Sequence, residues 1–152
     1  MKTCIRLIAL AAALIAGAAC ETDIKKAPDA VAKRFGEMYP GAAQVEWEKE
    51  GGTYTAEFLY EKHEMEAEFA EDGTWQRSKA DILLTEVPDP VYNAILELSE
   101  NRWEVDDIEH FTCADGDPEY YRITFDRDFS AHERVAHIAP DGSVLKIYNT
   151  LD

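Results

Sequence analysis

Two short motifs occur twice in this chain, in the same order, and this repetition constrains the fold more than any other feature. A motif built on Pro-Asp stands at 27–31 and again at 87–91, and one built on Asp-Gly stands at 69–75 and again at 138–144. The offset between the copies grows from 60 to 69 positions. The pattern predicts a duplicated structural unit, with about nine residues inserted in the second copy.

The first nineteen residues are predicted to be a secretory signal peptide. Lys2 and Arg6 accompany an apolar stretch, 5–19, which is shorter than the roughly 20 residues that a membrane-spanning helix needs. Small residues followed by Cys20 resemble a bacterial lipobox, which predicts that this cysteine is lipidated and that 20–27 is a tether. Plain cleavage after 16–18, followed by secretion, is the alternative.

The chain that remains after removal of 1–19 is strongly acidic. It keeps 13 basic and 31 acidic residues, so its formal charge is −18. This charge disfavours binding to nucleic acid and to anionic lipid, which leaves a lipid anchor as the only expected contact with a membrane. The acidic residues are spread through the sequence, which is typical of a solvated surface.

The first unit is predicted to be a helix followed by four antiparallel strands. Val31, Phe35 and Met38 recur at helical spacing from Pro28 to about Tyr39. Apolar residues then alternate with polar ones along 45–48, 54–60 and 65–69, and a fourth, short strand begins at Trp75. Between the last two, Asp72-Gly73 predicts a tight two-residue hairpin. This unit is expected to span 28–82.

A connector over 83–87 is followed by a second unit over 88–152. Its helix begins near Pro90, and a bulge is expected around 106–107, where the alternation slips by one residue. The expected fold class is therefore α+β, with two tandem helix-plus-four-stranded antiparallel units. In each unit the helix is expected to pack on one face of the sheet.

The first unit also resembles a known family of exported bacterial proteins. The resemblance rests on the following segments: Tyr39-Pro40-Gly41-Ala42, Val45-Glu46-Trp47, Tyr54-Thr55-Ala56-Glu57-Phe58 and Asp72-Gly73-Thr74-Trp75. These segments resemble the PepSY-like proteins of Bacteroidetes, which are often called β-lactamase-inhibitor-like. The resemblance covers 28–78 well and 88–149 weakly. It implies a tandem arrangement and a periplasmic or surface location. It also implies an inhibitor that uses its own exposed sheet face to block an enzyme.

Strand alternation predicts which side chains face away from the helices. In the first unit this face is acidic: Glu46, Glu48, Glu57, Glu64, Glu66 and Glu68. Because glutamate is depleted at the centres of protein interfaces, we expect this part to serve solubility, with a basic partner or divalent cations as the alternative. The second unit is expected to present Phe111, Tyr120, Arg122 and His137, which are better suited to binding a partner. A slip of one residue in strand phase would turn them inward.

No catalytic or cofactor motif is found in the sequence. His63-Glu64 and His132-Glu133 lack the second histidine, four residues on, that a zinc-protease helix requires. Cys113 and His110 lie three residues apart, so on a strand they point to opposite faces. We therefore expect no enzyme activity, no cofactor and no metal site.

The sequence thus predicts an exported, lipid-anchored, non-enzymatic binding protein. Its partner would be a protein of the cell envelope, such as a protease or another enzyme, held against the exposed sheet face. The alternative is an envelope protein that binds cations or a small ligand through the glutamate-rich face. A monomer is expected.

Overall fold

A computed structural model describes residues 22–24, 26–100, 102–114, 116, 118–127 and 132–151. Within this part of the chain, nine antiparallel strands form a single sheet in the order of the sequence. The elements are as follows: β1 (Thr22–Ile24), α1 (Asp29–Met38), β2 (Ala43–Glu50), β3 (Thr53–Tyr60), β4 (His63–Ala70), β5 (Trp75–Asp81), the 3₁₀ helix η1 (Leu84–Glu86), α2 (Asp89–Leu98), β6 (Glu104–Cys113), β7 (Tyr120–Asp126), β8 (His132–Ile138) and β9 (Val144–Leu151).

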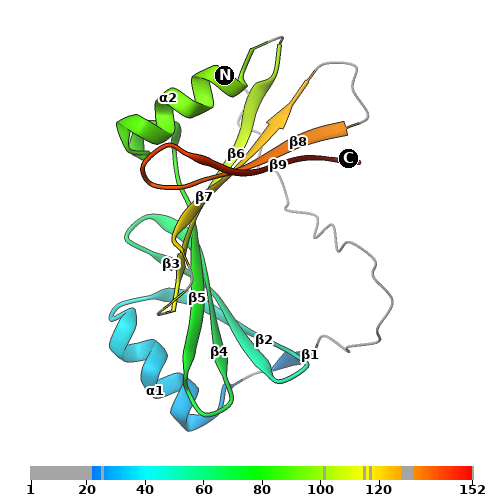
Figure 1. Cartoon of the computed structure of the whole chain (residues 1–152). Helices are drawn as coiled ribbons and strands as arrows, with labels where there is room; N and C mark the ends of the chain where they lie inside the picture. Colours follow the sequence, from blue (N-terminus) through cyan, green and yellow to red (C-terminus); the bar gives the residue numbers. More distant parts are fainter. Residues whose placement is uncertain are drawn as a thin grey trace, which may run out of the picture.

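Both helices cover the same face of the sheet, one over each half (Figure 1). Val31 and Phe35 of α1 are buried against Ala56, Phe58 and other side chains of β3 and β4. A second core forms under α2 and includes the following residues: Val91, Ile95, Ile108, Ile123 and Ile138. The fold is α+β, as the alternation and the helical spacing predict.

The strands predicted to form two four-stranded units, β2–β5 and β6–β9, lie in one continuous sheet. β5 pairs with β6 from Arg77 opposite Cys113 to Asp81 opposite Glu109. The short strand expected at Trp75 is seven residues long and continues to Asp81. Its pairing with β6 covers an edge that would otherwise expose a row of unbonded backbone groups.

Residues 22–24, which lie within the expected tether, form the edge strand β1. They pair with Trp47–Lys49 of β2 through the backbone. This strand carries little signal in the sequence, because pairing at an open edge depends on backbone groups rather than on side-chain alternation. The predicted signal peptide and Cys20, the predicted lipidation site, lie outside the described residues.

The Asp-Gly turns are built in the same way in both halves. Gly73 donates its N–H to the Ala70 carbonyl, and Gly142 donates to Ala139, at 2.9 and 2.8 Å. Ala70 in turn donates to the Thr74 carbonyl, which leaves a loop of three residues instead of the predicted two. Both glycines have positive φ, 89° and 88°.

Each of these turns lies against the first turn of the helix in its own half. A Cβ added to Gly73 would stand 2.8 Å from the Ala30 carbonyl oxygen, and one added to Gly142 would stand 2.6 Å from that of Pro90. The two motifs that recur in the sequence are therefore in contact with each other in both halves. The expected bulge in β6 is also present, as a shift of register between Val105 and Asp107.

Candidate functional site

The candidate site is the sheet face opposite the helices, here called the open face. The outer strands of both halves curve toward this side (Figure 1). Strand registers align its side chains in two long rows. One row runs from β2 to β7: Glu46, Glu57, Glu66, Lys79, Phe111 and Tyr120. The other runs from β5 to β9: Asp81, Glu109, Arg122, His137 and Lys146. In both rows acidic residues come first and basic or aromatic residues follow.

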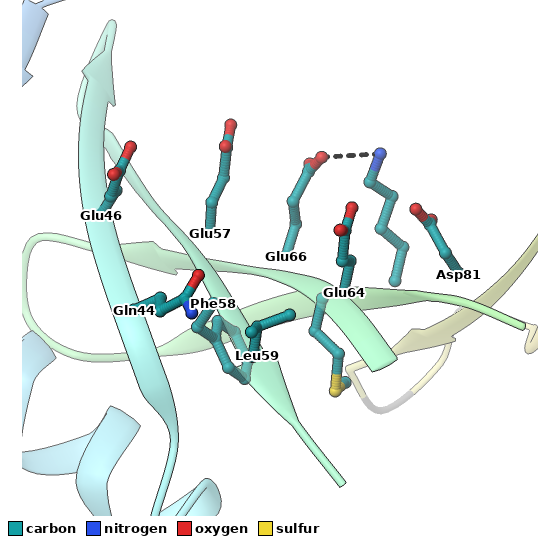
Figure 2. A pocket seen from close by; sticks show the side chains of 10 residues that line it. Gln44, Glu46, Glu57, Phe58, Leu59, Glu64, Glu66 and Asp81 are labelled. Atoms are coloured by element: carbon teal, nitrogen blue, oxygen red, sulfur yellow. Dashed lines mark ion pairs between the residues drawn. The ribbon is translucent and has the colours of Figure 1, made fainter. Parts of the chain in front are cut away.

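The end of the open face formed by β2 to β5 is acidic. Figure 2 shows the carboxylates of Glu46, Glu57, Glu64, Glu66 and Asp81 on one side of the sheet, pointing away from its surface. They line a hollow of about 300 Å³. Burial, followed by repulsion from Asp107, raises the pKa of Asp81 to about 6, and burial also raises the pKa of Asp107.

We predict that Asp81→Asn stabilises the protein at neutral pH. A carboxyl whose pKa is raised by folding binds its proton more tightly in the folded state than in the unfolded state. Ionised Asp81 therefore destabilises the fold above about pH 6, and this effect disappears as the pH falls toward 4. Because solvent screens a half-buried group, we expect a gain of about 1 kcal/mol in unfolding free energy at pH 7.5.

Urea unfolding at pH 7.5 and pH 4 measures this effect, and the gain should vanish at the lower pH. Asp29→Asn is the control, because the pKa of this exposed carboxyl is lowered by the hydrogen bond from Lys26. It should not stabilise the protein at neutral pH. An equal gain from Asp81→Asn at both pH values would contradict the assignment.

A network of ion pairs occupies the centre of the open face. Lys79 Nζ lies 2.6 Å from Glu66 Oε1 and 3.0 Å from Glu109 Oε1, and Arg122 also pairs with Glu109. Only 3% of the Glu109 side chain is exposed. Next to this network, Arg77 donates from Nε and Nη2 to Glu68 Oε1 at 2.9 and 2.6 Å. Two glutamates of β4, Glu66 and Glu68, are therefore neutralised by basic side chains of β5.

A stack of rings follows the network across β6, β7 and β8. Phe111 and Tyr120 stack at 4.7 Å with 6° between their planes, and Tyr120 and His137 stack at 4.7 Å with 8°. The ring of Tyr148 meets His137 edge-on at 5.9 Å. The Arg77 and Arg122 guanidiniums lie 6.0 and 5.8 Å from the centre of the Phe111 ring. This end of the face is aromatic and cationic, and it lines a groove of about 250 Å³.

The structure brings the predicted partner-binding residues together. Phe111, Tyr120, Arg122 and His137 all lie on the open face, as the strand phase predicts, and the acidic set lies on the same face. Phe111 is only 6% exposed, however, and its contacts with Tyr120 and the two arginines fill the space above it. Phe111 therefore supports the other side chains instead of offering a free surface, and the binding role of the set stays a prediction.

Sequence reasoning missed several side chains of this face. Arg77, Lys79 and Asp81 alternate along β5, and Lys146 and Tyr148 alternate along β9. The same period of two that identified the acidic face could have placed all five on one side of their strands.

The catalytic arrangements considered in the sequence do not form. His63-Glu64 and His132-Glu133 lie in β4 and β8, where neighbouring side chains point to opposite faces. His110 stacks on Tyr121 on the helix side, whereas Cys113 lies opposite Arg77 on the open face. Among the described residues, no three His, Cys, Asp or Glu side chains are grouped to hold a metal ion. No helix in the same ranges is long and apolar enough to cross a membrane.

The fold recurs in solved structures from Bacteroides. A DUF2874 family protein from Bacteroides ovatus is 25% identical, with a TM-score of 0.76 over 83% of this chain and 89% of that one. A protein from Bacteroides eggerthii that is proposed to be periplasmic is also 25% identical, with a TM-score of 0.74 over 82% and 89% of the two chains. A BLIP-like protein from Bacteroides fragilis is 20% identical, with a TM-score of 0.75 over 85% and 90%.

The chain shares the fold of the BLIP-like and DUF2874 proteins. These neighbours confirm the resemblance to the PepSY-like, β-lactamase-inhibitor-like family, which the sequence carries most clearly in its first half. Comparisons of the sequence with models of protein families and with curated proteins gave no match.

Proposed function

We propose that this protein is an exported, non-enzymatic binding protein that holds another envelope protein against its open face. The observation that carries the proposal is the stack of Phe111, Tyr120 and His137 with two arginines beside it. Aromatic residues and arginine supply most hot spots of protein interfaces, where rigid rings bury area at little cost in conformational entropy. The side-chain packing of this stack fixes its rings before any partner arrives.

Inhibition by steric occlusion is the activity that this surface supports. A partner enzyme seated on the open face would have its own active site covered by a preformed sheet, which requires no chemistry from this chain. The BLIP-like neighbour supports a role of this kind, since its fold is shared. The ion pairs at the centre of the face, between Lys79, Glu66 and Glu109, would hold the sheet rigid beneath the partner.

We further propose that the protein works in the cell envelope. The apolar segment 5–19 and the lipobox-like Cys20 support export and a lipid anchor. The neighbour from Bacteroides eggerthii that is proposed to be periplasmic supports the same location.

Duplication of a helix-plus-four-strand unit is proposed as the origin of this face. The recurring motifs make matching contacts in both halves, Gly73 against Ala30 and Gly142 against Pro90. Asp72 Oδ1 and Asp141 Oδ1 also accept matching hydrogen bonds from the N–H groups of Thr74 and Ser143, both at 2.9 Å. Divergence of the copies would then account for an acidic half beside an aromatic one.

We predict that Tyr120→Glu abolishes capture of the partner. The new carboxylate would be solvated in the free protein but left without water at the centre of an interface, which lowers capture by at least about tenfold. The immobilised protein would be exposed to a Bacteroides envelope extract, and captured proteins would be quantified by mass spectrometry and then assayed for inhibition. Tyr120 is preferred to Phe111 because Phe111 is buried and its substitution would disturb folding.

The control for this experiment is Leu96→Glu, which places the same charge on an exposed position of α2, on the helix side. It should leave capture unchanged. Capture that survives Tyr120→Glu, or that is lost equally with Leu96→Glu, would rule out the open face as the interface.

The second candidate function is loose, electrostatic cation binding by the acidic end, where Glu46, Glu57 and Glu66 are direct cross-strand neighbours. These carboxylates are not grouped as a preformed metal site, and Glu66 is already paired with Lys79. Calorimetric titration with calcium tests this candidate function. Saturable heat that is lost in Glu57→Gln would support a cation site, whereas heat no greater than that of simple dilution would dismiss it. Thr55→Val, on the same strand and face, serves as the matched control.

A further inference from the structure

Three basic side chains lie next to one another across the last three strands of the open face. Arg122 of β7 is the cross-strand partner of His137 of β8, which is in turn the partner of Lys146 of β9. Directly opposed residues on one face of an antiparallel pair have Cβ atoms about 5 Å apart. The ends of these three side chains can therefore reach a single small group placed above His137.

Each member of this row has hydrogen-bonding capacity that the described residues do not use. Arg122 pairs with Glu109 through Nε, and its guanidinium carries further N–H donors beyond this contact. Lys146 Nζ lies 4.5 Å from the centre of the Tyr148 ring and has no carboxylate partner in the described ranges. His137 Nε2 is buried without a hydrogen-bond partner. Because buried polar atoms are almost always hydrogen-bonded, this nitrogen calls for a missing partner.

The charge around the row favours an anion. β9 is the one described strand without an Asp or Glu, in a chain whose formal charge is −16. Burial, together with repulsion from Lys146 and Arg122, lowers the pKa of His137, and Glu109 opposes this shift. Glu109 shares its charge between Lys79 and Arg122, so the three basic residues together keep a net positive charge.

The groove beside the row has room for one side chain. Its volume is about 250 Å³, and its walls include the rings of Tyr120 and Tyr148. Glu66 and Glu68 also line it, and their charges are paired with Lys79 and Arg77. Such a volume lies below the range of about 300–1,000 Å³ that is typical of pockets for small-molecule ligands. A short acidic side chain would occupy the groove near Arg122 and His137, and an apolar or aromatic neighbour in the partner would lie against the tyrosine rings at its rim.

We propose that Arg122, His137 and Lys146 form a carboxylate-binding row, and that the partner protein inserts an acidic side chain there. This proposal rests on the protein-binding function proposed above and adds the chemistry of the partner. The carboxylate accepts hydrogen bonds from the Nη groups of Arg122, from Lys146 Nζ and from His137 Nε2–H. The rings of Tyr120 and Tyr148 exclude water from these bonds, which strengthens them.

The probe is the tripeptide Gly-Glu-Tyr with an acetylated N-terminus and an amidated C-terminus. Its binding to the folded protein is monitored by NMR. We expect saturable shifts in β7, β8 and β9 and a rise in the pKa of the His137 imidazole, because the bound anion opposes the charges of Arg122 and Lys146. The matched Gly-Gln-Tyr peptide should bind at least about tenfold more weakly. A tripeptide with a free C-terminal carboxylate and no acidic side chain shows whether the bound carboxylate can come from a chain terminus instead of a side chain.

Two variants assign the effect to the row. His137→Phe keeps the ring stacked on Tyr120 but removes Nε2, and Lys146→Gln removes one charge at the rim. Binding of the Glu peptide should weaken about tenfold in His137→Phe and about threefold in Lys146→Gln. Lys26→Gln removes a lysine that pairs with Asp29 next to α1 and should leave binding unchanged.

Equal binding of the Glu and Gln peptides, or an unchanged pKa of His137, would overturn the carboxylate row. Preferential binding of the terminal carboxylate would overturn the acidic side chain as its ligand. These failures are distinct from failure of the proposed function. If Tyr120→Glu abolishes capture while Lys146→Gln and His137→Phe do not, the interface stands and the row is wrong. If Tyr120→Glu leaves capture intact, the interface itself is wrong.

Discussion

Gly142→Ala should lower the free energy of unfolding by about 2–4 kcal/mol. Gly142 has φ of 88°, a left-handed conformation that costs an L-residue roughly 1–2 kcal/mol. The added Cβ would also stand 2.6 Å from the Pro90 carbonyl oxygen, which is backbone at the start of α2 and cannot rotate away. The turn and the helix must therefore separate, which opens the core beneath them.

Gly36→Ala is the matched control, because it makes the same chemical change without either penalty. Gly36 lies in α1, has no atom within 4 Å of an added Cβ, and does not have positive φ. Alanine there should stabilise the protein by up to about 1 kcal/mol, since it reduces the entropy of the unfolded chain. Urea unfolding measures both variants, and a Gly142→Ala protein as stable as the parent would show that the close contact with Pro90 does not exist.

The corresponding variant in the first half, Gly73→Ala, tests whether the two halves are equivalent. Its Cβ would meet the Ala30 carbonyl oxygen at 2.8 Å, at the start of α1. A loss similar to that of Gly142→Ala would support the proposed duplication at the level of energetics. A much smaller loss would mean that the recurring motifs do not make equivalent contacts.

The sequence could predict the facing of side chains but not the partners that they find across the sheet. Period-two alternation placed Glu66 and Arg122 on one face correctly, because each strand alternates independently of its neighbours. The pairing of β5 with β6 joins residues about thirty positions apart, and no local pattern encodes that register. The Lys79–Glu109 ion pair depends on this register and was therefore not predictable.

The burial of some side chains on the open face could likewise not be predicted from the sequence. Glu109 and Phe111 alternate as outward-facing residues, yet both are nearly inaccessible to solvent. The curvature of the sheet and the arginines that lie over Phe111 bury them, and both are tertiary effects. A residue can thus face away from the helices and still belong to the packed interior.

Lys79→Met should lower the free energy of unfolding by about 2–3 kcal/mol. The lysine side chain is 24% exposed and contacts both Glu66 and Glu109, whereas Glu109 is 3% exposed. Methionine keeps most of the apolar stem but leaves Glu109 with Arg122 as its one remaining charged partner among the described residues. Removal of one partner of a buried ion pair costs about 3–5 kcal/mol, and the partial exposure of Lys79 reduces this value.

The double variant Lys79→Met with Glu109→Gln separates loss of the ion pair from loss of packing. Once Glu109 is replaced by neutral glutamine, the Lys79→Met substitution no longer leaves a poorly compensated buried charge. The double variant should therefore be at least about 1 kcal/mol more stable than the sum of the single effects predicts. Lys33→Met, which removes an exposed lysine of α1, should change stability by less than about 0.5 kcal/mol. Strict additivity of the two central substitutions would mean that Lys79 stabilises the sheet by packing alone, and that the charge network at the centre of the open face contributes nothing to its rigidity.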